Sequence, residues 1–139
     1  MKLLKHLLPV ALVLAIGSTA VRAEDTPMEK EMSAMNKAYK ALKKSVEDPS
    51  KKEDNLKLLA EIKKTAEASA KMEPKTTKDQ PDAQKAAYLE KFRAQMSDYI
   101  KAVTEVEAAV NAGNGAAAKA GLDKLNDLKK KGHEDFKKD

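Results

Sequence analysis

Two residues near opposite ends of the chain have side chains that could share a metal. Met32 lies in the segment EMSAMNKAYKAL, and His133 lies in LNDLKKKGHEDFK. A thioether and an imidazole together can ligate haem iron, and thioethers also suit Cu(I). Both residues could instead have purely structural roles, the methionine by filling the core and the histidine by interacting with a helix dipole. The chain has no cysteine, which excludes thiolate metal sites, Fe–S clusters and covalent haem attachment.

The first 23 residues have the pattern of a secretory signal peptide. Lys2 and Lys5 form a positive start, and residues 7–16 are apolar. Val21 and Ala23 then provide small or tolerated residues at positions −3 and −1 of a cleavage site that precedes Glu24. We therefore predict a cleaved signal peptide over residues 1–23 and export to the periplasm. An uncleaved anchor is the alternative, but spanning a bilayer needs roughly 20 apolar residues. The second histidine, His6, would leave with this leader.

Charge and composition limit the function of the mature chain, residues 24–139. The whole chain carries +5, and the leader accounts for three basic residues and no acid, which leaves +2. This balance is unlike a nucleic-acid-binding protein, which concentrates positive charge. Beyond the leader no segment approaches membrane-spanning length, so we expect a soluble protein and no membrane contact. Motifs such as GxSxG, HExxH and a glycine-rich phosphate loop are absent, so we do not expect an enzyme.

Capping residues and helix breakers predict two helices in the first half of the mature chain. Thr26 can cap a helix whose third residue, Glu29, completes a capping box, and Asp48-Pro49 ends this helix. A second capping box, Ser50 with Glu53, is predicted to open the next helix. The first helix carries apolar residues three and four positions apart, which form one continuous seam: Met28, Met32, Met35, Tyr39, Leu42 and Val46.

The second half repeats this organisation. A proline-containing loop over residues 73–82 precedes a helix over about residues 81–111, and the glycines at 113–115 stop it and start a fourth helix. Four amphipathic helices with short connections predict an all-α, antiparallel up-down-up-down bundle. The first and last helices are then antiparallel neighbours, so Met32 and His133 would meet at the same end. His133 borders the apolar stripe of the last helix by its spacing from Leu122 and Phe136.

These segments resemble the cytochrome b562 family over nearly all of the mature chain. EMSAMNKAYKAL is similar to the opening helix of the family, with Met32 on its axial methionine, and LNDLKKKGHEDFK is similar to the closing helix, with His133 on its axial histidine. KFRAQM at residues 91–96 resembles the segment that packs against the haem, and VNAGN at 110–114 resembles the turn into the last helix. Gly132 departs from the family pattern, which has a tyrosine there.

The resemblance implies a b-type cytochrome that transfers one electron. It implies one non-covalent haem b per chain, with Met32 and His133 as the iron ligands and no open position for a substrate. Lysines near the open end of the bundle, such as Lys129 and Lys137, could meet the haem propionates, and the sequence does not single out which of them do. Met96 departs from the family, which has a second aromatic residue there. The implied apolar wall of the haem pocket consists of Met35, Tyr39, Phe92, Met96 and Phe136.

Two other functions remain open at this stage. The thioethers of Met28, Met32 and Met35, together with His133, could form a copper site in a periplasmic copper-handling protein. A haem-free helical adaptor is the other alternative. We expect a monomer, and the sequence does not identify the redox partner protein.

Overall fold

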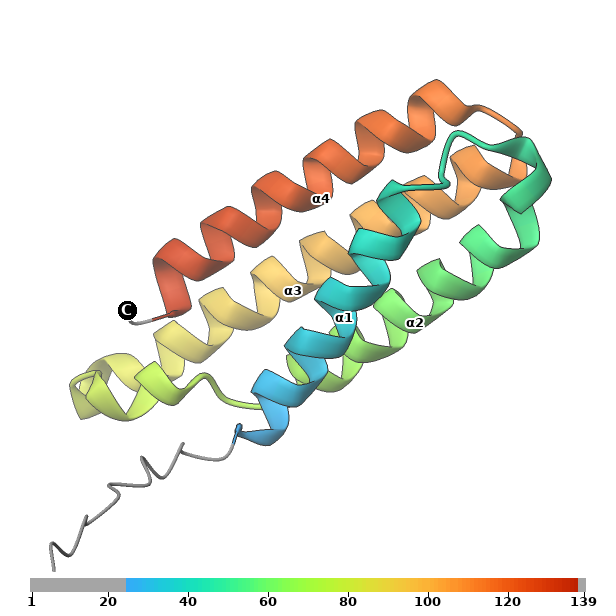
Figure 1. Ribbon diagram of the computed structural model, residues 1–139. Coiled ribbons are helices and arrows are strands. Elements are labelled where there is room, and N and C mark those ends of the chain that lie inside the picture. Colours follow the sequence, from blue (N-terminus) through green and yellow to red (C-terminus); the bar gives the residue numbers. More distant parts are fainter. Residues whose placement is uncertain (1–24, 138–139) are drawn as a thin grey trace, which may run out of the picture.

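The structure is a computed structural model that describes residues 25–137, so the predicted leader and its His6 lie outside the described residues. The described chain forms an antiparallel up-down-up-down bundle, as the sequence predicted (Figure 1). None of the described helices is both long and apolar enough to cross a membrane. The helices are α1 (Pro27–Lys43), α2 (Lys52–Ala70), α3 (Asp82–Asn111) and α4 (Gly115–Phe136), with short 3-10 helices η1 (Pro49–Lys51) and η2 (Lys75–Asp79) in the connections.

The first predicted capping box is confirmed at the start of α1. The Thr26 hydroxyl accepts from the Glu29 backbone N–H at 3.3 Å, and the Thr26 N–H donates to Glu29 Oε2 at 2.6 Å. Pro27 occupies the first turn, where its missing N–H costs no helical hydrogen bond. These contacts set the start of the helix that carries Met32.

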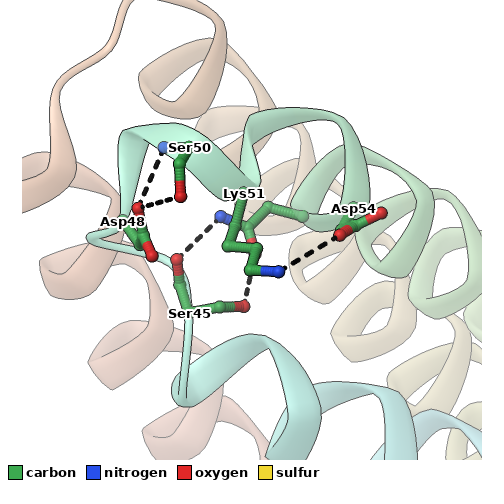
Figure 2. A network of polar contacts seen from close by, with 6 residues as sticks. Ser45, Asp48, Ser50, Lys51 and Asp54 are labelled. Atoms are coloured by element: carbon green, nitrogen blue, oxygen red, sulfur yellow. Dashed lines mark hydrogen bonds and ion pairs between the residues drawn. The ribbon is translucent and has the colours of Figure 1, made fainter.

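The second predicted capping box is wrong. Lys51, not Ser50, is the N-cap of α2, and it makes no side-chain capping hydrogen bond. Ser50 instead donates its N–H and its hydroxyl to Asp48 Oδ1, at 2.9 and 2.7 Å (Figure 2). Because the Asp48 carboxylate caps η1, the 3-10 turn takes up Ser50, and α2 begins two residues later.

At one end of the bundle the two tight connections pack against each other. Gly113 has a φ of +70°, a conformation that favours glycine, and Asn114 Oδ1 accepts from the Ala117 N–H at 3.0 Å to cap α4. A Cβ on Gly115 would lie 3.2 Å from Glu47 Cα, so α4 starts against the α1–α2 connection. We call this the closed end. We call the opposite end, where α1 begins and α4 finishes, the terminal end (Figure 1).

The core follows the predicted apolar seams, but the seam of α1 is less fully buried towards the terminal end. Leu42 and Val46 of the first seam are buried, whereas Met28 and Met32 are only partly buried against the core. A polar group is also buried near the closed end: Asn55 bonds the hydroxyl and carbonyl of Ser45, at 2.6 and 2.9 Å. The largest fully buried apolar side chains are Leu42, Leu59, Ile62, Val103, Val106, Leu122 and Leu125.

Candidate functional site

The two predicted ligands lie in the terminal-end halves of α1 and α4. Met32 is in the second turn of α1, with its side chain partly buried against the core. His133 is in the last turn of α4, and its side chain is exposed. The spacing in sequence had placed His133 at the border of the apolar stripe. In the structure it lies at the solvent side of that border, since the His133 side chain is exposed whereas Phe136, one turn later, is buried.

A contact between α1 and α4 fixes their register. Lys129 Nζ donates to Asn36 Oδ1 at 3.4 Å. Met32 lies one turn before Asn36, and His133 lies one turn after Lys129. Since the two helices are antiparallel, this register brings Met32 and His133 to the same height along the bundle.

Long side chains, rather than closely packed backbones, join α1 to α4. The backbones of these two helices approach each other far less than those of α1 and α2, α2 and α3, or α3 and α4. The Tyr39 hydroxyl donates to the Leu122 carbonyl at 3.1 Å, and Lys129 Nζ lies 5.4 Å from the centre of the Tyr39 ring. Side chains rather than packed backbones therefore fill the seam between α1 and α4.

The five predicted wall residues all belong to the buried core. Two of them are in direct ring contact, since Phe92 and Phe136 pack edge to face with centroids 5.2 Å apart. Such pairs add about 0.5–1.5 kcal/mol to the burial of their surface. The exposed fractions of the five side chains are Met35 8%, Tyr39 7%, Phe92 4%, Met96 8% and Phe136 8%.

The surroundings of His133 favour its neutral form. The pKa of His133 is lowered, first by partial desolvation of the ring and then by the positive charges of Lys137 and Lys129. These lysines lie one turn on either side of the histidine. A neutral imidazole is the form that ligates a metal, so the direction of this shift is compatible with the predicted role of His133.

A cluster at the end of α4 was missed by the sequence reasoning. Thr76, in η2, donates its hydroxyl to the Phe136 carbonyl at 2.7 Å, and Tyr88 Oη lies against Thr76 Oγ1. Nearby, the pKa of Asp135 is lowered, chiefly by its hydrogen bond to Lys91 and then by that to Gln95. These partners are far apart in sequence. The available signal was Tyr88, an aromatic residue one turn before the predicted haem-packing segment.

The methionines expected for a copper site follow the core stripe. Met35 is buried at 8% exposure, and the same face of α1 continues into Tyr39, which is also buried. Met28 and Met32 are partly buried against the same core. Within residues 25–137 no three His, Asp or Glu side chains are grouped so that they could hold a metal ion. The packing therefore gives the copper alternative no specific support.

A family model described as Cytochrome b562 matches residues 27–137. No curated protein and no solved structure gives a significant match. The matched region spans the four helices and includes both predicted ligands.

Proposed function

This chain belongs to the cytochrome b562 family, a family of b-type electron carriers, and we propose that it carries one electron on a single haem b in the periplasm. The observation that supports this function most strongly is the family match over residues 27–137. We also propose that it acts as a soluble monomer and passes its electron to a redox partner protein rather than catalysing a reaction on a substrate.

We propose Met32 and His133 as the two axial ligands. The register supported by the Lys129–Asn36 contact brings both residues to the same height on facing helices. The lowered pKa of His133 keeps its ring nitrogen free of a second proton. A methionine and a histidine ligand together would suit an iron that changes oxidation state with little rearrangement and would raise its reduction potential.

The other residues of the chain would bind and shield the group. Phe92 and Phe136, which are buried and pack edge to face, would supply apolar surface to the haem pocket. Lys129 and Lys137 place two positive charges one turn from His133, where they can meet carboxylates. Binding would require Lys129 to exchange its present contact with Asn36 for such a carboxylate.

Optical spectroscopy of the exported protein mixed with haemin tests this proposal. We expect a sharp low-spin spectrum after dithionite reduction. We expect Met32→Ala to shift it towards high spin, and His133→Ala to weaken haem retention sharply. Met28→Ala is the matched control, because Met28 lies one turn away on the same partly buried face of α1. Equal, small effects of all three changes would contradict the proposed ligands, and a copper titration would then separate the alternative.

The proposed location depends on the leader and has its own test. Cell fractionation should recover the protein in the periplasm, beginning at residue 24 by N-terminal sequencing. A protein that keeps residues 1–23 and stays with the membrane would contradict both the cleavage and the location.

A further inference from the structure

The last turn of α4 carries His133 and is anchored by residues from other parts of the chain. The final carbonyls of a helix have no partner within the helix. Here the Phe136 carbonyl accepts from Thr76 Oγ1 at 2.7 Å, and Tyr88 Oη lies 3.4 Å from the Asp135 carbonyl oxygen. Thr76 lies in η2 and Tyr88 in α3, so two separate elements reach this helix end.

The two hydroxyls form a directed relay. Thr76 has one hydroxyl proton, and it is donated to the Phe136 carbonyl. In the contact between the hydroxyls of Thr76 and Tyr88, Tyr88 must then be the donor. Each hydroxyl therefore depends on the other, and loss of either one leaves the end of α4 with a weaker cap.

The side chain of Asp135 adds an anchor on the α3 side. Its Oδ1 lies 3.0 Å from Lys91 Nζ, and its Oδ2 accepts from Gln95 Nε2. A Cβ on Gly132 would lie 3.9 Å from Gln95 Oε1, so the Gln95 amide also lies against the backbone of Gly132. A single side chain of α3 thus contacts α4 just before and just after His133.

The ring of Phe136 completes the anchor. This ring packs edge to face against the rings of Tyr88 and Phe92, and its centroid lies 5.1 Å from that of Tyr88. Lys91 Nζ lies 5.9 Å from the centre of the Phe136 ring. We call the set Thr76, Tyr88, Lys91 and Gln95, together with the Asp135 and Phe136 that they hold, the C-terminal latch.

We propose that the C-terminal latch is a positioning device. It holds the last turn of α4 before haem binds, and thereby keeps His133 in the position from which it would ligate the haem iron. The proposal rests on the proposed function. His133 is exposed, so its position depends on the backbone turn that carries it. A helix end without such anchors frays, and the ligand would then have to be ordered during binding. With the C-terminal latch, the last turn of α4 becomes ordered when the protein folds and not when haem binds.

Substitutions at Thr76 test the proposal in the full-length mature protein. Thr76→Val removes the hydroxyl and keeps the shape, whereas Thr76→Ser keeps the hydroxyl. Thr104→Val is the matched control, because the Thr104 hydroxyl donates only to its own helix, to the Ile100 carbonyl at 3.2 Å. Three quantities are measured: amide hydrogen exchange of residues 134–137 without haem, the rate of haem dissociation, and the high-spin fraction at saturating haem.

In Thr76→Val we expect faster exchange confined to residues 134–137, by roughly three- to tenfold, the effect of losing one hydrogen bond. Haem dissociation should accelerate by a similar factor, with a larger high-spin fraction. Thr76→Ser should restore wild-type values, and Thr104→Val should change none of the three. Tyr88→Phe, which removes the other hydroxyl of the relay, should reproduce Thr76→Val.

Unchanged exchange and haem dissociation in both Thr76→Val and Tyr88→Phe would overturn the latch and leave the proposed function intact. Exchange that rises equally throughout the four helices would also overturn it, because the hydroxyls would then stabilise the fold without positioning the ligand. If the wild-type protein showed no specific haem spectrum, the proposed function would fail, and the positioning role would fail with it.

Discussion

At the closed end, backbones touch across the bundle, whereas at the terminal end α1 and α4 are joined by side chains. Lys52 donates to the Asn111 carbonyl at 3.0 Å, and Gly115 lies against Glu47, so the closed end ties both connections together (Figure 2 shows the α1–α2 connection). At the terminal end, Lys129 reaches Asn36 across a wider seam. The closed end is therefore held by close backbone contacts, whereas side chains bridge the seam between α1 and α4 at the terminal end.

Two core substitutions on the same helix should show this difference most strongly. Leu42, near the closed end, is 0% exposed, and Met32, near the terminal end, is only partly buried. Leu42→Ala should lower the free energy of unfolding of the haem-free protein by about 2–5 kcal/mol. Met32→Ala should lower it by about 1 kcal/mol or less, since its site is partly solvated. Urea denaturation measures both, and equal losses would show that the terminal end is packed as tightly as the closed end.

The two interior glycines of α4 should respond in opposite directions. Gly121 lies in the half of α4 towards the closed end, where an added Cβ would be 2.5 Å from Val106 Cγ2. Gly121→Ala should therefore cost about 1–3 kcal/mol of stability, because the helices must move apart. Thermal unfolding of the haem-free protein measures this change. A neutral result would mean that α3 and α4 can shift at little cost.

Gly132 is the counterpart in the terminal-end half of α4. An added Cβ there would meet only Gln95 Oε1, at 3.9 Å, which is an ordinary contact. Gly132→Ala should stabilise the haem-free protein by about 0.5–1 kcal/mol, because alanine favours the helix over the unfolded chain. The same thermal unfolding experiment applies. Destabilisation would show that the Gln95 amide needs the space beside Gly132.

The smallest expected effect concerns pH at the start of α1. The pKa of Glu29 is lowered from 4.5 to about 2, first by its hydrogen bond to Lys75 and then by that to the Thr26 backbone. A lowered pKa means that the ionised side chain stabilises the fold above pH 4.5, and that this contribution is lost as the pH falls towards 2. Glu29→Gln should therefore be less stable than wild type at pH 6 and equally stable near pH 2.

Denaturation of both proteins across this pH range measures the Glu29 contribution. A constant gap between wild type and Glu29→Gln at every pH would assign the effect to packing instead of charge.

The sequence by itself determined the helices, their order and most of their buried faces. Apolar residues three and four positions apart define a helix face locally, and Thr26 with Glu29 sets the start of α1 within one turn. The same local patterns placed Met32 and His133 near matching ends of the first and last helices. Their roles as ligands stay predictions, since they depend on a bound group.

Only the tertiary structure decided the contacts that depend on distant residues. The sequence pattern assigned Ser50 to the N-cap of α2, paired with Glu53. In the structure the Ser50 N–H donates to the Asp48 carboxylate instead. The exposure of His133 and the wide seam between α1 and α4 depend on how the helices pack. The C-terminal latch joins Thr76 to Phe136, 60 residues apart. No local pattern encodes such a pairing, because the two partners come together only after the bundle has closed.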